Sequence, residues 1–452
     1  MKQLLGVTTF FVAMMLLNSG ATTSDLGRVT NAPALPTAVL ASAKADQEIG
    51  EAVTQEATKA KQLPANGVKG ADNGAPFTKP GIDHDAKGKK AGTVRVQSRS
   101  IEIALVANSV AGTVALVDVA SRSVLGTIDV NPARVKSEGP GAPNYAQDTD
   151  VSPDGRTLYV SRGYVGDVAA FDIASGRLLW VRSLNTGRAD HMTLTPDGRS
   201  LFVSALLDNR VYKVATATGE ITGHLVTGVY PHDNKVSRDG RRLYNSSIGP
   251  LGTLPRKADA PPLTEKPGYP FQLTIADAGT LQIRDRIQFD KGIRPWEFTP
   301  DEKGLYTQLS NEHAVVAYNL VARKVVKRLD LPVKPGVTAA DWDFEAPHHG
   351  LALTPDGRTL CLAGRASDYA ALVRAPALTL IATIPVGDAP GWSEVADNGR
   401  LCFVANTRSD DLSIISIPER KEIVRLPIGD GPKHITVARI PASVLAAFKA
   451  RR

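Results

Sequence analysis

The chain has 452 residues, a net charge of +7 at neutral pH, 39 glycines, 30 prolines and two cysteines. This length allows a large core, and the many glycines and prolines suit a fold with many turns. The positive charge is modest for the length, and no base-stacking or groove-reading motif accompanies it, which excludes a nucleic-acid-binding protein. The chain lacks a Cys-x-x-Cys-His motif, which excludes covalently attached c-type haem.

The N-terminal residues have the pattern of an export signal. Lys2 precedes an apolar stretch from Leu4 to Leu17, and Ser19-Gly20-Ala21 supplies the small residues that a signal peptidase needs. We therefore expect residues 1–21 to be a signal peptide, with an uncleaved N-terminal anchor as the alternative, and the mature protein to be periplasmic or secreted. No later segment approaches the ~20 apolar residues of a membrane span, so none is expected after cleavage.

Two further segments are expected to lie outside the folded domain. Residues 22–98 are rich in Ala, Lys, Gly and Pro and poor in aromatic residues, so they cannot bury enough apolar surface to fold alone. We interpret them as a disordered linker. Residues 443–452 end in Lys449 and two arginines and are expected to form a basic C-terminal tail.

A polar tight turn recurs along residues 99–442 at intervals of roughly 40 residues, the period of a β-propeller blade. Each turn is Pro-Asp-Gly or a close variant between two short β-rich runs, as expected of a hairpin. Two more strand-like runs follow, so each unit has four strands. The six turns lie at 153–155, 196–198, 238–240, 300–304, 355–357 and 397–399.

The two ends of the repeat region complement each other. The first unit begins at a second-strand run, Ile103 to Asn108, and therefore lacks its innermost strand. Pro432 to Val437 is a first-strand run with no unit after it. Joined, they make one blade and close the ring, which leaves only short, protected edges. The sequence predicts an all-β fold, a seven-bladed β-propeller closed by a C-terminal innermost strand.

The second-strand runs Leu105-Val106-Ala107-Asn108, Tyr159-Val160-Ser161-Arg162 and Phe403-Val404-Ala405-Asn406 resemble the signature of the YVTN-repeat bacterial β-propellers. The links Ile384 to Pro390 and Leu426 to Pro432 are similar to that family's connection between blades. The resemblance covers roughly Ile101 to Ala438 and implies the propeller fold. It does not imply one function, because related propellers include surface proteins, haem or quinone enzymes, lactonases and lyases.

The two cysteines, Cys361 and Cys402, fall in the second strands of the sixth and seventh blades. An exported protein can keep a disulfide. The cysteines stand at different offsets from their turns, however, so their side chains are expected to point in different directions, and a bridge needs a narrow Cα separation. We therefore expect two buried free thiols rather than a disulfide.

Most of the histidines gather where each first strand begins, beside the central channel, together with carboxylates and tryptophans. Imidazoles and carboxylates are metal ligands, and a ligating His usually donates its other N–H to a carboxylate or carbonyl. The predicted metal ligands are His191, His232, His348, His349, Asp148 and Asp233. The predicted cofactor-contacting residues are His191, His232, His349, His434, Trp296 and Trp392.

Most of these residues stand six positions (Asp148, His191, Asp233, Trp392) or seven positions (His232, His349) before the Asp or Asn of a turn, and neighbouring positions on a regular strand point to opposite sides. The side chains therefore need not all converge. They share the face opposite the Pro-Asp-Gly turns with three insertions, at 131–147, 249–269 and 333–346. The segment Ala340 to Pro347 leads directly into His348-His349 and is interpreted as a lid or recognition loop.

Three classes of function remain open. We expect an exported propeller, monomeric, that binds a metal, cofactor or small ligand at the His-lined channel mouth. A transition metal ion is expected ahead of haem or quinone. The first alternative is a periplasmic redox or hydrolytic enzyme using the same face, in which His and a carboxylate activate water. The second is a surface module that binds a protein through exposed aromatics such as Tyr269, Trp342 and Phe344.

Overall fold

The computed structural model describes residues 99–251 and 265–451. The expected signal peptide, residues 1–21, and the expected linker, residues 22–98, lie outside the described residues. In the part of the chain that the structure describes, no helix combines the length and apolar character needed to cross a membrane.

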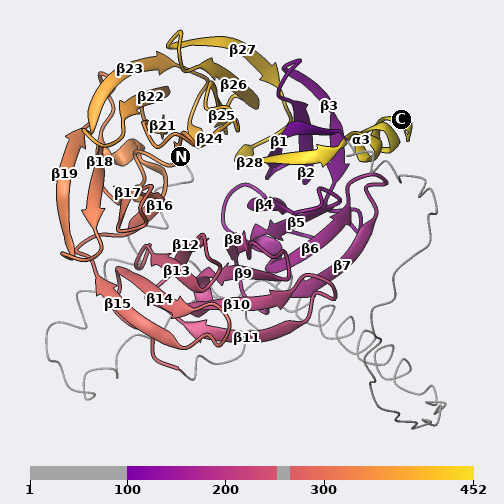
Figure 1. Ribbon diagram of the computed structural model, residues 1–452, viewed down its shortest axis with the longest axis horizontal. Helices are drawn as coiled ribbons and strands as arrows, with labels where there is room; N and C mark the ends of the chain where they lie inside the picture. Colours follow the sequence, from indigo (N-terminus) through magenta and orange to yellow (C-terminus); the bar gives the residue numbers. More distant parts are fainter. Residues whose placement is uncertain (1–98, 252–264, 452) are drawn as a thin grey trace, which may run out of the picture. The chain divides into compact units, whose positions relative to one another are not determined.

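Seven four-stranded antiparallel sheets stand in a ring with their first strands innermost, which confirms the predicted seven-bladed β-propeller (Figure 1). We number the blades in chain order and give the strands of each from the innermost outward. Blade 1 consists of β28 (Pro432–Pro441), β1 (Ser100–Asn108), β2 (Thr113–Asp118) and β3 (Ser123–Asp129); blade 2 of β4 (Asp148–Val151), β5 (Thr157–Arg162), β6 (Asp167–Asp172) and β7 (Leu178–Ser183); blade 3 of β8 (Ala189–Leu194), β9 (Ser200–Ala205), β10 (Arg210–Ala215) and β11 (Ile221–Val226).

The remaining four blades follow the same order. Blade 4 consists of β12 (Pro231–Val236), β13 (Arg242–Ser247), β14 (Gln272–Asp277) and β15 (Ile283–Gln288); blade 5 of β16 (Ile293–Phe298), β17 (Gly304–Leu309), β18 (Ala314–Asn319) and β19 (Lys324–Asp330). Blade 6 consists of β20 (Leu351–Leu353), β21 (Thr359–Gly364), β22 (Tyr369–Arg374) and β23 (Thr379–Pro385); blade 7 of β24 (Pro390–Val395), β25 (Leu401–Asn406), β26 (Asp411–Ser416) and β27 (Lys421–Pro427).

The ring closes as the sequence predicts. β28 pairs antiparallel with β1 from Ser100 opposite Pro441 to Asn108 opposite Pro432, so the last strand completes the first blade. The residues after β28, expected as a basic tail, instead lie largely in the helix α3 (Ala442–Ala450). Its apolar side chains Val444, Leu445 and Phe448 are buried against blades 1 and 2. Apolar residues spaced along one helical face explain the difference, because that face buries surface that a tail would leave in water.

A repeated hydrogen-bond pattern explains the Pro-Asp-Gly turns. In five blades a Ser or Thr hydroxyl donates to the Asp two residues later, as from Thr195 to Asp197 at 2.6 Å. The same carboxylate accepts the backbone N–H two residues further on, as from Arg199 at 3.1 Å. In the turns of blades 2, 3, 4, 6 and 7 the Gly adopts positive φ, +71° at Gly198, which favours glycine, whereas Glu302 takes this position in blade 5 with φ 54°. Each turn therefore fixes the register between the first and second strands.

The hydrophobic core lies between neighbouring blades. Along β1, Ile103 and Leu105 belong to the cluster shared with blade 2. The residues between and after them, Ala104 and Val106, belong to the cluster shared with blade 7. This period-2 alternation buries both faces of the sheet, as required of a blade with a neighbour on each side. The inner strands are thereby held rigidly around the channel.

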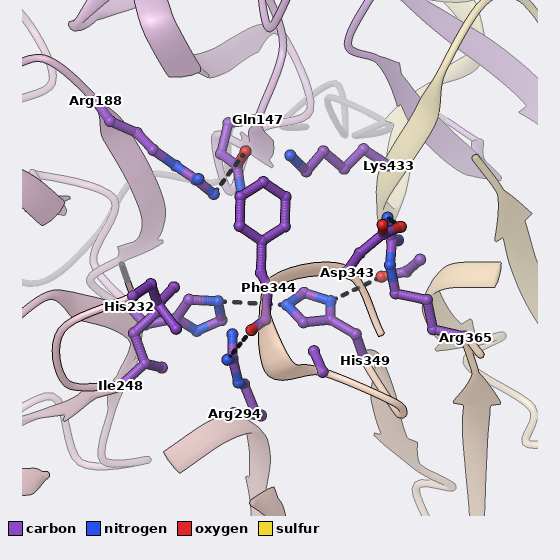
Figure 2. Close-up of a pocket in the computed structure, with 13 residues that line it drawn as sticks. Gln147, Arg188, His232, Ile248, Arg294, Asp343, Phe344, His349, Arg365 and Lys433 are labelled. Atoms are coloured by element: carbon purple, nitrogen blue, oxygen red, sulfur yellow. Dashed lines mark hydrogen bonds and ion pairs between the residues drawn. The ribbon is translucent and has the colours of Figure 1, made fainter. Parts of the chain in front are cut away.

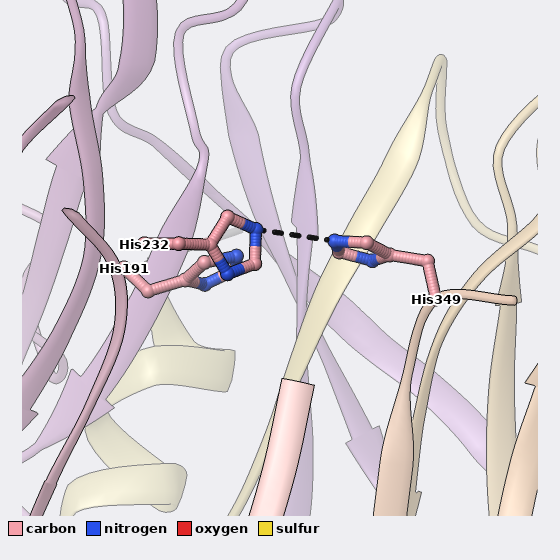
Figure 3. A group of neighbouring side chains, drawn as sticks. All are labelled: His191, His232 and His349. Atoms are coloured by element: carbon pink, nitrogen blue, oxygen red, sulfur yellow. Dashed lines mark hydrogen bonds between the residues drawn. The ribbon is translucent and has the colours of Figure 1, made fainter. Parts of the chain in front are cut away.

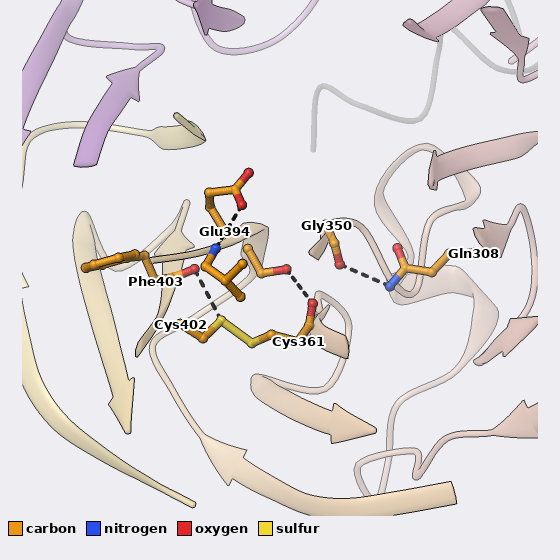
Figure 4. Close-up of a disulfide and its surroundings, with 8 residues drawn as sticks. Gln308, Gly350, Cys361, Glu394, Cys402 and Phe403 are labelled. Carbon is orange, nitrogen blue, oxygen red and sulfur yellow. Dashed lines mark hydrogen bonds between the residues drawn. A yellow bond between two sulfur atoms is a disulfide. The ribbon is translucent and has the colours of Figure 1, made fainter. Parts of the chain in front are cut away.

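Cys361 and Cys402 form a disulfide between blades 6 and 7, so the expectation of two free thiols is wrong (Figure 4). Their Cα atoms lie 6.6 Å apart, within the range that a disulfide spans. Both residues belong to the core cluster between these blades. Two neighbouring blades pack opposite faces of their sheets against the shared core. Two side chains that meet there must therefore lie on opposite faces of their own sheets. The difference in offset that argued against a bridge is what permits it.

Replacing both cysteines with alanine should lower the free energy of unfolding by ~2–4 kcal/mol, because the bridge closes a loop of 41 residues between two blades. Urea unfolding followed by tryptophan fluorescence measures the change. The matched control is the wild-type protein treated with reductant, which should reproduce the loss. Unfolding curves that coincide for the variant and the oxidised wild type would show that the bridge contributes nothing.

Candidate metal centre

The innermost strands bulge near the channel mouth. In β8, the pairing with β9 jumps from Ala189 to Met192, which leaves two residues opposite one. β12 and β16 have the same irregularity between Pro231 and Asn234 and between Ile293 and Trp296. A bulge of this kind redirects side chains and breaks the strict alternation of a strand. Consecutive residues such as Asp190 and His191 can therefore both contribute to the site, which corrects the expectation that the two offsets point apart.

Three histidines from three blades converge in the channel (Figure 3). His191 belongs to β8, His232 to β12, and His349 lies two residues before the start of β20. One ring nitrogen from each lies within 4.8 Å of those of the other two. His191 and His232 are buried, and His349 is partly exposed to the cavity above it. The sequence predicts all three at the channel, and the structure brings them together as one group.

The distance between His232 and His349 has the value that two ligands of one metal ion require. Their Nε2 atoms lie 3.3 Å apart. Two nitrogens that bind a tetrahedral ion at ~2.0–2.1 Å stand about 3.3–3.4 Å from each other. Without an ion the contact is a hydrogen bond from the Nε2–H of His232, because the Nδ1–H of His349 donates to the carbonyl of Gly391 at 2.9 Å and leaves its Nε2 as an acceptor.

His191 has the hydrogen bonding of a histidine ligand. Its Nδ1 lies 3.1 Å from Oδ2 of Asp148 and donates to that carboxylate, so that in the neutral ring Nε2 has no proton. That Nε2 is buried and has no hydrogen-bond partner among the described residues. A carboxylate behind a ligating histidine fixes the ring and its tautomer. An orphaned imidazole nitrogen aimed at two other imidazoles is what a metal ion would satisfy.

The protonation states of the three histidines differ. Burial lowers the pKa of His232 and of His349 well below the usual value, so both are neutral at neutral pH. Burial acts in the same direction on His191, but the hydrogen bond that His191 donates to Asp148 and the charge of Asp190 together raise its pKa above the usual value. Neutral imidazole is the form that binds metal, so His191 is the member of the group for which protons compete with an ion.

Asp148 also contacts His434, which extends the cluster toward blade 1. The Nδ1 of His434 lies 2.8 Å from Oδ1 of Asp148, at an angle that does not suit a hydrogen bond, and burial lowers the pKa of His434, which favours its neutral form. These two residues and His191 form a second group that could hold a metal ion. Trp392 covers the cluster, with ring centroids 5.0 Å from His191 and 4.1 Å from His434.

The other predicted site residues lie elsewhere. His348 points away from the channel and contacts His313 at 3.1 Å and the hydroxyl of Tyr369 at 3.2 Å. Asp233 accepts the backbone N–H of Trp296 from the next blade and joins neither metal-ligand group. The ring of Trp296 is buried in the core between blades 4 and 5. Of the predicted ligands, the structure therefore gathers His191, His232, His349 and Asp148, with His434 beside them.

Basic side chains surround the cavity above the three histidines, on the face opposite the Pro-Asp-Gly turns (Figure 2). They come from four blades and were not singled out as site residues from the sequence: Arg188, Arg294, Arg365 and Lys433. Arg294 stands seven residues before the Asp of its turn, as His232 and His349 do. Lys433 is the second residue of β28, as His232 is of β12. These shared positions could have identified both basic residues from the sequence. Burial, with the charge of Arg188, lowers the pKa of Lys433 to about 7. Burial lowers the pKa of Arg294 to about 10.

The insertion before blade 6 covers this mouth. It contains the short helices η3 (Ala339–Asp341) and η4 (Asp343–Glu345). Asp343 accepts hydrogen bonds from Arg365 at 2.9 Å and from Arg408 at 2.9 Å, which ties the loop to blades 6 and 7. Phe344 has a left-handed backbone, φ 52°, and its carbonyl accepts from Arg294. The loop interpreted as a lid therefore lies over the channel and contributes to its cavity.

The opposite mouth, at the Pro-Asp-Gly turns, is lined by carboxylates around Lys235. Lys235 pairs with Glu297 at 2.6 Å. Burial raises the pKa of Asp150 to about 7 and that of Glu394 to about 7. The two ends of the channel thus differ in charge, with a basic mouth above the histidines and an acidic mouth below them.

Comparison with solved structures finds the same fold at low sequence identity. A structure described as hydrazine synthase from Kuenenia stuttgartiensis aligns with a TM-score of 0.53 and 18% identity, over 68% of this chain and 89% of that one. The periplasmic gluconolactonase of Pseudomonas aeruginosa aligns with a TM-score of 0.55 and 20% identity, over 76% of this chain and 100% of that one. At such identity the likeness shows the fold alone.

The sequence comparisons add no family. No family model matches the chain, and a search of the curated proteins finds no match. The YVTN-repeat family is therefore not confirmed, whereas the seven-bladed propeller is established by the sheet topology.

The acidic mouth generates a prediction about pH and stability. Because burial raises the pKa of Glu394 from about 4.5 to about 7, the folded state holds this proton more tightly than the unfolded chain does. Ionisation of Glu394 between these values therefore weakens folding as pH rises. Glu394→Gln, which keeps the acceptor for the N–H of Val395, should raise the free energy of unfolding by ~1–2 kcal/mol at pH 8 and by little at pH 4.

Urea unfolding at the two pH values measures this difference. The exposed Glu220 supplies the matched control, since Glu220→Gln should change stability equally little at both values. An effect of Glu394→Gln that does not grow with pH would show that this carboxyl ionises normally in the folded protein.

Proposed function

We propose that the protein is an exported β-propeller that binds one divalent transition-metal ion through His191, His232 and His349. The observation that carries the proposal is the convergence of three imidazole nitrogens within 4.8 Å, one of them buried and unpartnered. Nitrogen ligands suit zinc and its first-row neighbours rather than magnesium or calcium, which prefer oxygen. Asp148 orients His191, and the carbonyl of Gly391 orients His349.

Export is part of this proposal. The N-terminal pattern of residues 1–21 predicts secretion, and the disulfide between Cys361 and Cys402 suits an oxidising compartment. The bacterial periplasm is such a compartment.

Hydrolysis is the chemistry that the arrangement suits. Three protein ligands with an open side are typical of catalytic zinc, in which water or substrate fills the remaining position. The open side here faces the cavity, which His232 and His349 help to line. Oδ1 of Asp190 lies 3.9 Å from Nε2 of His191, and Oδ2 of Asp190 is buried with no partner among the described residues. If the three histidines hold an ion that activates water, Asp190 would be the general base beside it.

The structural neighbour described as a gluconolactonase suggests lactones as a first substrate class to test. At this identity the two proteins share only the fold, so the substrate class is part of the proposal. If this reading is right, the zinc-loaded protein hydrolyses lactones or esters, and Asp190→Asn lowers the rate at least ~100-fold, as expected for loss of a general base. Turnover that is unchanged in Asp190→Asn would remove Asp190 from the reaction.

The metal site itself is tested by binding. Protein prepared without a metal-affinity tag and stripped with chelator should bind one Zn²⁺ or Co²⁺ per chain in a calorimetric titration. His191→Ala, His232→Ala and His349→Ala should each weaken binding at least ~100-fold, because each removes one of three ligands. His224→Ala is the control, since His224 lies half-exposed on β11 and pairs with Glu265. Equal affinity in the three variants and the control would overturn the site.

The carboxylate behind His191 gives a finer test. Asp148→Asn should lower zinc affinity ~10–100-fold, because it weakens the hydrogen bond that orients His191. Asp150→Asn is a matched control two residues along the same strand. Both carboxylates accept a backbone N–H from β8, at 2.9 Å from Met192 and 2.9 Å from Leu194, but only Asp148 contacts histidines. If both variants lose affinity alike, Asp148 acts through the strand rather than through His191.

A further inference from the structure

The cavity above the three histidines has more buried positive charge than its own carboxylates balance. Four basic side chains from four blades line it: Arg188, Arg294, Arg365 and Lys433. Arg188 is only 7% exposed and Arg294 only 2%. Burying a charged group is costly unless it is paired and hydrogen-bonded. What each of these groups contacts therefore shows whether the cavity is complete without a ligand.

Arg365 and Arg294 are held by the protein. Arg365 donates to Asp343 at 2.9 Å, although this carboxylate is shared with Arg408. Arg294 donates to Oγ of Ser310 at 2.8 Å and to the carbonyl of Phe344. The guanidinium of Arg294 therefore meets neutral oxygens, and its pairing with a charge is only at longer range, with Glu345.

Arg188 and Lys433 are held loosely or not at all. Arg188 reaches Oδ1 of Asp190 at 3.4 Å and the side-chain oxygens of Tyr164 and Gln147 at 3.5 Å, all long for charged donors. Its Nε is buried without a partner among the described residues. The ammonium of Lys433 makes no hydrogen bond or ion pair within the described ranges. Arg188 and Lys433 therefore have N–H donors that face the cavity and are free to bind a ligand.

Counted over the described residues, five cations stand at this mouth against four carboxylates. The cations are the four lining residues and Arg408; the carboxylates are Asp190, Asp343, Glu345 and Asp388, which lies 3.9 Å from Arg408. The excess is at most one positive charge, because the lowered pKa of Lys433 leaves this side chain partly neutral at pH 7. A metal ion on the histidines would add to the excess.

The shape of the cavity limits what can supply the missing negative charge. The enclosed part of the cavity is small, about 40 Å³, and opens to solvent, so a ligand would place only part of itself inside and the rest in the open mouth. The ring of Phe344 stands among Arg188, Gln147 and Lys433, and lies 5.9 Å from the guanidinium carbon of Arg188 (Figure 2). Phe344 is 47% exposed and has a left-handed backbone, φ 52°, which holds its ring over the cavity.

We propose that this mouth binds a small organic polyanion, with two or more carboxylate or phosphate groups, between Arg188, Arg294 and Lys433 and beneath Phe344. Guanidinium groups pair with the oxygens of carboxylate and phosphate in two parallel hydrogen bonds, and the lysine adds a point charge. The phenyl ring covers the carbon skeleton. This inference rests on the proposed function, because the ligand's reactive group would lie over the same three histidines.

Anion binding is measured on the full chain stripped of metal, so that it is independent of the metal site. Tricarballylate and glycerol 3-phosphate are titrated calorimetrically beside acetate and neutral glycerol. At least one of the two polyanions should bind with a dissociation constant below ~1 mM, at least tenfold tighter than acetate, and its affinity should fall as salt rises. Which of the two binds distinguishes a carboxylate site from a phosphate site.

Side-chain variants locate the site. Arg188→Met and Lys433→Met should each weaken the polyanion at least tenfold, whereas Lys324→Met, on the exposed face of β19, should stay within twofold of wild type. Thermal unfolding shows whether each variant is folded. If Arg188→Met does not fold, Lys433→Met alone provides the test. Absence of polyanion binding at 10 mM, acetate binding as tightly, or full affinity in Lys433→Met overturns the inference.

The two proposals fail separately. If the protein binds zinc but no polyanion, the anion site is refuted and the metal centre stands. If the protein binds the polyanion but no zinc, the metal centre is refuted and the anion site stands.

Discussion

The functional face depends on one constraint, the bulge in the innermost strands where they reach the channel mouth. On a regular strand only alternate residues face the channel, so each blade would supply one side chain per layer. With two residues opposite one, as between Ala189 and Met192, neighbouring side chains contribute to successive layers. The lower layer contains Asp148, His191 and His434, and the upper layer contains His232, His349 and the basic residues of the cavity. The metal-ligand group spans both layers.

Such a concentration of buried polar groups needs a rigid frame. Imidazoles, carboxylates and guanidinium groups lose hydration when they are buried, and they are tolerated only where partners are held in place. The frame here consists of apolar clusters between every pair of neighbouring blades, the strand pairing of β28 with β1, and the disulfide between blades 6 and 7. Hydrogen bonds between blades continue into the channel, where Asp148 and Asp233 each accept a backbone N–H from the next inner strand.

The fold could be predicted from the sequence because its signals are local and repeated. The Pro-Asp-Gly turns and the split first blade gave the blade number and the ring closure. The direction in which a side chain points was harder to predict, because it depends on bulges in the strands and on which faces of neighbouring blades pack together. Cys361 and Cys402 seemed misaligned along their strands, yet they face each other across a shared core. His348 and Trp296 carried the same local pattern as the ligands but pack between blades, and Arg188 and Arg365 come from loops that only the closed ring brings together.

Anomalous diffraction at the zinc edge from crystals grown with Zn²⁺ would test the central claim most directly. The account predicts one strong peak in the channel, bonded at ~2.0–2.1 Å to a nitrogen of each of His191, His232 and His349, with an open position toward the cavity. Metal-saturated crystals that show no peak there, and in which His232 and His349 remain hydrogen-bonded to each other, would contradict it.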